Sequence, residues 1–172
     1  FLRLRNPEAH AWISEPSWEN HRQLFEQAGF QVKSYRYYEP KTHGLDFAGM
    51  KESLNQIPAG SVVVLHSCCH NPTGVDLTND QWTETLEIVS SRNLVPFLDL
   101  AYQGFADGLD ADAFAPRLFS TAMSPVFLSS SFSKFDSVLQ GLAQGAGQQI
   151  FQQLEQAAVA APACAADLVE QI

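Results

Sequence analysis

The sequence lacks a long apolar run and has few cysteines. No segment approaches the roughly 20 apolar residues that cross a bilayer, so we expect no membrane partner. The first residues show no charged-then-apolar signal pattern, which favours a cytoplasmic location, and the first residue, Phe1, indicates a fragment. Of three cysteines, Cys68 and Cys69 are neighbours and Cys164 is distant, a pattern that predicts reduced thiols and no disulfide framework.

Positive charge is also scarce. The chain has 10 Lys and Arg against 19 Asp and Glu, and its net charge of −9 would repel a phosphate backbone, so nucleic acid is not an expected partner. After Lys134 no Lys, Arg or His occurs, and the chain becomes rich in Ala, Gln and Gly. We therefore expect two parts, 1–134 and a divergent tail 135–172, in which a helix over 148–161 would stop before Pro162. A shifted reading frame, a fusion to foreign sequence or true divergence would each explain this tail, and the abrupt loss of basic residues favours one of the first two.

The remaining pattern alternates strand-like and helix-like stretches. Ser17 is a candidate cap for a helix over 18–28, with Leu24 on its apolar face, and Thr78 with Gln81 forms a capping box before a second helix. A short helix is expected over 110–119. Apolar or alternating runs predict strands over 31–37, 61–66, 94–100 and 125–128. This order predicts an α/β fold with a mostly parallel sheet flanked by helices, whose ligands bind at the carboxyl ends of the strands.

Three polar clusters follow predicted strands, at 66–74, 99–104 and 129–134. In the last cluster, Lys134 can form a Schiff base with an aldehyde cofactor if its amine loses its proton. The hydroxyls of Ser131 and Ser133 can then donate to a phosphate. A solvated lysine at a loop edge explains the same four residues, and these residues alone favour that simpler interpretation.

Asp99 ends an apolar strand, where a carboxylate needs a partner. A protonated pyridine nitrogen would be one, and that proton lets the ring act as an electron sink; a helix cap or a solvated acid explains Asp99 equally well. The hydroxyl of Tyr102 can bond a phenolic oxygen of the cofactor, while Ala101 leaves room for a flat ring. Ordinary aromatic packing is the commoner role for a tyrosine.

Asn71 lies in a turn pinned by Pro72 and Gly74, so its amide can also donate to the phenolic oxygen. The same residues are equally good turn formers without any ligand. The run His66-Ser67-Cys68-Cys69-His70 suggests zinc, but neighbouring strand residues point to opposite faces and no second cysteine pair follows. We therefore expect these cysteines to be core residues and predict no metal site.

Together the segments HSCCHNPTGVDLT, DLAYQGF and SFSK resemble the aspartate and aromatic amino-acid aminotransferases, which are fold type I enzymes that depend on pyridoxal 5'-phosphate (PLP). The segments WISEPSWENH and YYEPKTHGLDF fit the same family, so the resemblance covers residues 1–134. It implies that this part belongs to the PLP-binding large domain. A long ordered set of motifs carries the resemblance.

The resemblance implies a role for each matching residue. Lys134 would bind PLP covalently and move the substrate proton, Asp99 would pair with the pyridine nitrogen, and Tyr102 and Asn71 would bond the phenolic oxygen. Ser131 and Ser133 would belong to the loop that binds the phosphate. The reaction would be ping-pong transfer of an amino group from an aromatic or dicarboxylic amino acid to 2-oxoglutarate. The full-length enzymes of the family are homodimers.

The chain also departs from the family. The resemblance implies a phosphate-binding arginine eight residues after the lysine, where this sequence has Leu142. It also implies that the Gly-containing phosphate loop and the small domain with its carboxylate-binding arginine fall outside this chain. A non-catalytic remnant that binds no cofactor is therefore the alternative function, and a zinc or thiol enzyme is a third hypothesis. The substrate preference, dimerisation and activity of this fragment stay open.

Overall fold

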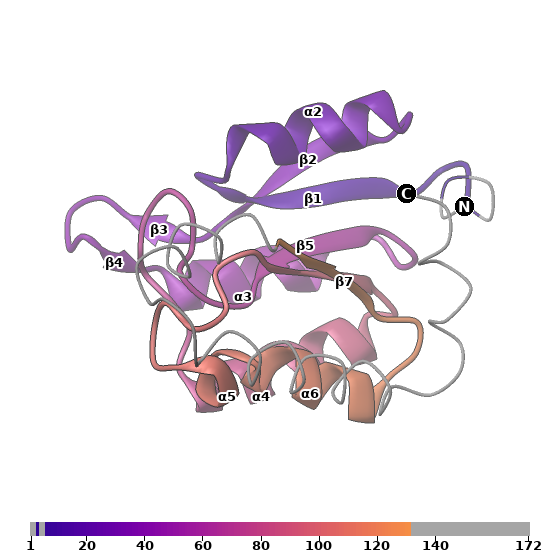
Figure 1. Cartoon of the computed structure of the whole chain (residues 1–172). Helices are drawn as coiled ribbons and strands as arrows, with labels where there is room; N and C mark the ends of the chain where they lie inside the picture. The colour runs from indigo at the N-terminus through magenta and orange to yellow at the C-terminus, as the bar shows by residue number, and fades with distance from the viewer. Residues whose placement is uncertain (1–2, 4–5, 132–172) are drawn as a thin grey trace. The chain divides into compact units, whose positions relative to one another are not determined.

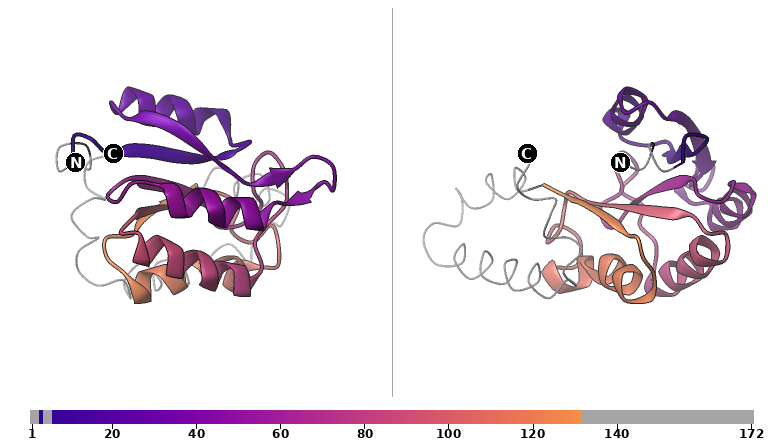
Figure 2. Two further views of the ribbon diagram at one scale, coloured as in Figure 1. Left: turned by 180° about the vertical axis from the view of Figure 1, so that it is seen from behind. Right: turned by 90° about the vertical axis from the view of Figure 1, so that its right-hand side faces the viewer.

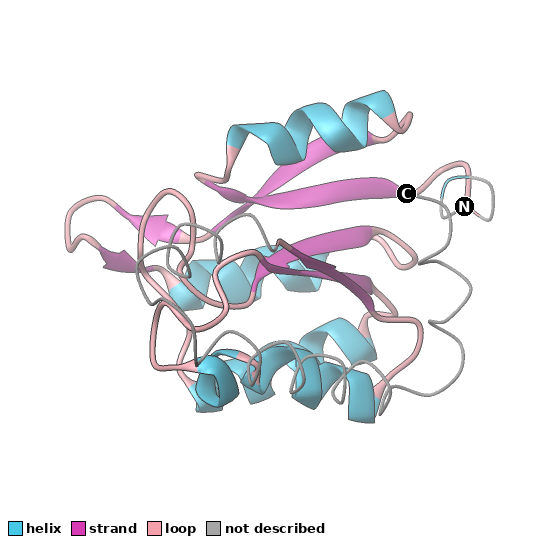
Figure 3. Cartoon of the chain, viewed as in Figure 1, coloured by secondary structure: helices cyan, strands magenta, loops and turns pink. Residues whose placement is uncertain are grey.

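In the computed structural model the described part of the chain is Arg3 and residues 6–131. It contains a five-stranded parallel sheet in the order β2-β1-β5-β6-β7 and a separate antiparallel pair, β3-β4 (Figures 1 and 3). The elements, in chain order, are β1 (His10–Glu15), α2 (Glu19–Gln27), β2 (Gln31–Arg36), β3 (Tyr38–Glu39), β4 (Gly44–Leu45), α3 (Phe47–Gln56), β5 (Val62–His66), α4 (Asn79–Ser91), β6 (Val95–Leu100), α5 (Leu109–Asp112), α6 (Phe114–Ala122) and β7 (Phe127–Ser130).

Helices cover both faces of the sheet. Helix α2 lies on one face, and α3, α4 and α6 lie on the other, as the side view in Figure 2 shows. Among the described residues no helix is long and apolar enough to cross a membrane. The predicted α/β fold with a mostly parallel, helix-flanked sheet is therefore confirmed.

The buried strand β5 explains why two cores form. Successive side chains of a strand point to opposite faces. Val62 and Val64 pack under α2 with Phe25, whereas Val63 and Leu65 pack against the helices of the other face. These four residues are at most 1% exposed, so the continuous apolar run serves both cores, as expected of a central parallel strand.

Strand order places a switch point between β1 and β5. From β1 the chain moves outward to β2, and after α3 it returns to the opposite side of β1 to form β5. In doubly wound sheets a crevice opens at the carboxyl ends of such a strand pair, because the connections leave in opposite directions. The segments that follow Glu15 and His66 therefore meet at the position where ligands usually bind.

Several predicted boundaries agree with the structure. The Thr78–Gln81 capping box is present in both directions, since the Gln81 amide donates to Thr78 Oγ1 and the Thr78 amide donates to Gln81 Oε1. Pro96 is the second residue of β6, where its missing N–H is tolerated. The sequence-based interpretation assigned no element to β1 or α3.

Other boundaries were wrong. Helix α2 begins after Trp18 without a side-chain cap, because the Ser17 hydroxyl bonds His21 and His66 instead, and Leu24 is 56% exposed. The single helix predicted over 110–119 is two helices that meet at Ala113. The last strand is β7 (Phe127–Ser130), two residues later than predicted, because Phe127 pairs with Phe97 of β6.

Candidate functional site

The described site residues lie at one edge of the sheet. Strands β5, β6 and β7 are parallel neighbours, and His66 is in register with Asp99, which is in register with Ser129. Their carboxyl ends therefore deliver the following residues to the same edge: Asn71 after β5, Asp99 within β6, Ala101 and Tyr102 after β6, and Ser131 after β7. Ser133 and Lys134 lie outside the described residues, as do the boundary at residue 134 and the helix predicted over 148–161.

Asp99 is 7% exposed, and its protein partner is His21 of α2. His21 Nε2 lies 2.9 Å from Asp99 Oδ2. A buried carboxylate requires such a donor. Among the described residues no hydrogen bond engages the second oxygen, Oδ1, so this carboxylate keeps an acceptor for a ligand.

Sequence reasoning missed His21. The signal was available, because His21 and Phe25 are one helical turn apart and are the buried residues of α2, whereas the prediction gave the buried face to Leu24 and Phe25. A polar side chain on the buried stripe of an amphipathic helix needs a partner in the sheet below it. That requirement points to Asp99.

A second polar layer supports His21. Ser17 Oγ lies 3.2 Å from His21 Nδ1 and 3.4 Å from His66 Nε2. The His66 ring lies between the other two imidazoles, with its centroid 4.9 Å from that of His21 and 4.4 Å from that of His70. The ends of β1 and β5 thus join through three histidines and a serine at the switch point.

His70 is held on both sides of its ring. Its Nε2 lies 2.9 Å from Ser14 Oγ, and its Nδ1 lies 2.8 Å from Thr73 Oγ1. Tyr37 stacks on the ring at a centroid distance of 3.9 Å and donates its hydroxyl to the Val75 carbonyl at 2.6 Å. The turn that contains Asn71 therefore follows directly after His70, whose ring these contacts hold in place.

The two strand-end imidazoles are neutral at neutral pH. Burial, reinforced by the neighbouring His70 and His21 and opposed by Asp99, lowers the pKa of His66 to about 3. Burial also lowers the pKa of His70 to about 4. Burial raises the pKa of Tyr37 as well, which keeps its phenol protonated.

Trp18 is a further residue that sequence reasoning did not single out. Its indole is 39% exposed, and it meets the His21 ring edge to face at a centroid distance of 5.2 Å. An exposed aromatic face beside the partner of Asp99 offers a surface on which a flat ring can pack. Only the packing of α2 on the sheet brings Trp18 to this edge.

The zinc hypothesis rested on five consecutive residues. Strand β5 ends at His66, so the alternation of side chains in a strand does not apply to the residues after it. The argument that these side chains diverge was therefore wrong for His66 and His70, whose rings lie close together. Cys68 is buried, Cys69 is half-buried, and both are free thiols. Within the described residues no three His, Cys, Asp or Glu side chains are placed to share a metal ion.

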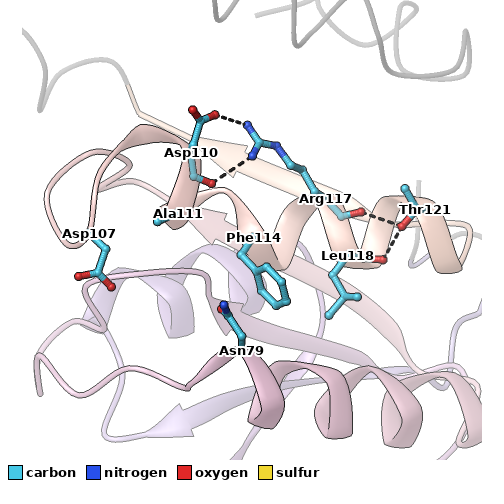
Figure 4. Close-up of a pocket in the computed structure, with 8 residues that line it drawn as sticks. All are labelled: Asn79, Asp107, Asp110, Ala111, Phe114, Arg117, Leu118 and Thr121. Atoms are coloured by element: carbon cyan, nitrogen blue, oxygen red, sulfur yellow. Dashed lines mark hydrogen bonds and ion pairs between the residues drawn. The ribbon is translucent and has the colours of Figure 1, made fainter.

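Two surface hollows lie in the described part of the chain. One, of about 380 Å³, lies between α5–α6 and the start of α4, and Arg117 bonds Asp110 at its rim (Figure 4). The other, of about 300 Å³, lies where β1 leads into α2 and is lined in part by Ser17 and Trp18. Neither is lined by Asn71, Asp99 or Tyr102.

The fold and this edge define a class of protein. In an α/β sheet of this kind ligands bind at the carboxyl ends of the parallel strands, which here carry the buried Asp99 and lead into the segments of Asn71 and Tyr102. The chain belongs to the class I and II aminotransferases, because the model of that family matches residues 1–158.

Individual relatives agree with this assignment. The chain is 55% identical over 134 residues to an aspartate aminotransferase of Pseudomonas aeruginosa, covering 78% of this chain and 34% of the relative. It is 49% identical over 138 residues to an aromatic-amino-acid aminotransferase of Escherichia coli, covering 80% of this chain and 35% of the relative. The chain thus spans about a third of the length of these relatives.

A solved structure supports the fold. The aromatic-amino-acid aminotransferase of Burkholderia pseudomallei, which is covalently bound to pyridoxal phosphate, superposes with a TM-score of 0.75 at 58% identity. The superposition covers 77% of this chain and 33% of that chain.

Proposed function

We propose that the protein from which this chain comes transfers an amino group from an aromatic or dicarboxylic amino acid to 2-oxoglutarate, with pyridoxal 5'-phosphate as cofactor. The buried Asp99 carboxylate, held by His21 through one oxygen and without a bond to the other among the described residues, is the observation that carries the proposal. PLP, when bound, supplies an electron sink for the bond broken at the substrate's α-carbon.

The described residues fit this cofactor. Asp99 Oδ1 is available to a protonated ring nitrogen, and a negative charge there keeps that nitrogen protonated. His21 holds the carboxylate in place. Asn71 and Tyr102 supply an amide and a phenol for the phenolic oxygen, Ala101 is small enough to leave space for the ring, and Trp18 offers a flat face beside it.

The segment SFSK, residues 131–134, would bind the phosphate and hold the cofactor covalently. Ser131 and Ser133 would donate hydroxyl hydrogens to the phosphate, and Lys134 would bind the cofactor covalently. Once released by substrate, the Lys134 amine would carry the proton between the substrate's α-carbon and the cofactor's C4' carbon. The relatives are named as aspartate and as aromatic enzymes, so both substrate classes belong to the proposal. We expect a cytoplasmic homodimer for the full-length protein.

The test is a PLP titration of the full chain. We expect a new absorption band from the covalent adduct, and borohydride reduction followed by peptide mapping should place the cofactor on Lys134. Lys134→Ala should abolish both signals. Lys41→Ala and Lys51→Ala are matched controls, since Lys41 is exposed and the Lys51 amine bonds Glu84. Equal labelling of all three lysines would rule out specific binding.

A non-catalytic remnant is the second candidate. The chain covers about a third of its relatives, and Leu142 stands where the family has a phosphate-binding arginine. Each missing charge-assisted contact costs roughly 1.5–3 kcal/mol of binding free energy. Absence of the adduct at millimolar PLP, with the circular dichroism of a folded α/β protein, would favour this candidate.

A further inference from the structure

Two loops at the carboxyl edge of the sheet are each folded around one carboxylate. The first loop follows β6 and contains Tyr102. The carboxylate of Asp112, a residue of α5 that is 5% exposed, accepts backbone N–H groups from Gly104 at 2.7 Å, Asp107 at 2.9 Å and Ala106 at 3.2 Å. Hydrogen bonds to an ionised acceptor are stronger than neutral ones, so three of them constrain the loop tightly.

Other contacts in the same loop pass this constraint to Tyr102. The Phe105 amide donates to the Tyr102 carbonyl at 3.1 Å, and the two rings meet edge to face. Gln103, which is 8% exposed, donates its amide to the Leu109 carbonyl at 2.9 Å. Tyr102 is therefore fixed by β6 on one side and by the Asp112-bound loop on the other.

The second loop follows β5 and contains Asn71. The carboxylate of Asp76 accepts the backbone N–H groups of Cys69 and His70, both at 2.7 Å. These amides immediately precede Asn71, and the Gly74 amide closes the turn on the His70 carbonyl at 2.7 Å. Asn71 is thus held in the same way as Tyr102, by an anion that binds the adjoining backbone.

The two loops are neighbours. The Ser67 amide donates to the Asp99 carbonyl at 2.8 Å, which joins the ends of β5 and β6. Cys68 lies between them: burial raises the pKa of its thiol, and the negative charges of Asp112 and Asp76 raise it further. Both carboxylates are therefore close enough to act on the same buried thiol.

We propose that Asp112 and Asp76 are positioning residues, which hold Tyr102 and Asn71 so that the phenol and the amide converge on a single oxygen of the ligand. Neither carboxylate needs to touch the ligand, because each acts through backbone N–H groups. This inference rests on the proposed function, in which that oxygen is the phenolic oxygen of PLP.

The test measures the pKa of the Lys134–PLP adduct from its absorbance as a function of pH. Hydrogen bonds to the phenolic oxygen stabilise its negative charge and weaken its hold on the adduct proton, so they lower this pKa. We expect Asp112→Asn to raise it by roughly half a unit to one unit, the effect of weakening one hydrogen bond. Asp76→Asn should act in the same direction.

The direction of the change in the adduct pKa distinguishes a positioning role of Asp112 from a direct effect of its charge. Removing a negative charge without moving Tyr102 would lower the pKa of a positively charged adduct. The matched controls Asp110→Asn and Asp80→Asn remove exposed charges next to the same segments and should not raise the pKa. In a Tyr102→Phe background Asp112→Asn should add nothing, because the phenol through which it acts is gone. Asp112→Glu, which keeps the charge and displaces it, should also raise the pKa and serves if Asp112→Asn does not fold.

Hydrogen exchange of the cofactor-free chain gives a second readout. Asp112→Asn should speed exchange at the amides of Gly104, Ala106 and Asp107, with exchange at Leu98 in β6 unchanged. If the adduct forms on Lys134 and Tyr102→Phe raises its pKa but neither aspartate variant does, the inference fails and the proposed function stands. If wild-type chain forms no adduct on Lys134, both fail.

Discussion

The buried pair of His21 and Asp99 shows what one residue can and cannot reveal in a sequence. Asp99 was identified because a carboxylate at the end of an apolar strand needs a partner. Its protein partner was not identified, because His21 is 78 positions away and only the packing of α2 on the sheet brings the two together. The cofactor roles of Asp99, Asn71, Tyr102 and Ala101 stay predictions.

Buried neutral histidines predict a pH-dependent stability. The pKa of His66 is about 3 and that of His70 about 4 in the fold, against roughly 6.5 when unfolded. Below about pH 6.5 the unfolded chain binds more protons than the folded chain, so stability should fall as the pH drops from 6.5 towards 4. The slope for each histidine is about 1.4 kcal/mol per pH unit.

Urea unfolding at several pH values measures this slope through tryptophan fluorescence. His66→Gln should flatten the pH dependence, because glutamine keeps a polar side chain that does not titrate. The control His43→Asn changes an exposed histidine in the β3–β4 hairpin and should leave the slope as in the wild type. A slope unaltered by His66→Gln would mean that His66 is not neutral in the fold.

At the scale of elements, the sequence predicted the helix boundaries that depend on neighbouring residues only. The capping box of α4 was predicted correctly because all its partners lie within four residues. The start of α2 and the division between α5 and α6 were not predicted, since Ser17 bonds the distant His66 as well as His21, and the Asp112 carboxylate turns back to the preceding loop. Tertiary contacts overrode local preference at both places, and both places border the site.

The α4 cap can be tested directly. Thr78→Ala removes the side chain that accepts the Gln81 amide, and we expect the free energy of unfolding to fall by about 1 kcal/mol. Thr83→Ala is the matched control inside the same helix, where the Thr83 hydroxyl donates to the Asn79 carbonyl and alanine has the higher helix propensity. Equal losses from both substitutions, measured by urea unfolding, would count against the cap.

At the scale of the whole molecule, the parallel α/β sheet was predictable because helical and extended segments alternate along the chain. The order of strands was not, since no residue pattern states that β1 lies between β2 and β5. The sequence also carries about a third of the length of the named relatives. The family resemblance implies a phosphate-binding arginine at the position that Leu142 occupies in this sequence.

Restoring that charge predicts a gain in affinity. Leu142→Arg should tighten PLP binding by roughly tenfold or more, the effect of one charge-assisted contact to a phosphate. Pyridoxal, which lacks the phosphate, should bind as it does to the wild type. The control Gln149→Arg adds the same charge seven positions later. If equilibrium titrations show the same increase in PLP affinity for both arginine variants, the increase comes from net charge and not from a contact at position 142.

The bond between helix α2 and strand β6 also bears on when the site can form during translation. A ribosome releases His21 long before Asp99, so the imidazole waits without its acid until β6 has left the exit tunnel. If the proposed function holds, nascent chains that end before β6 would lack the acid that pairs with the cofactor. Loading with PLP would then be a late event of biosynthesis, coupled to completion of the sheet.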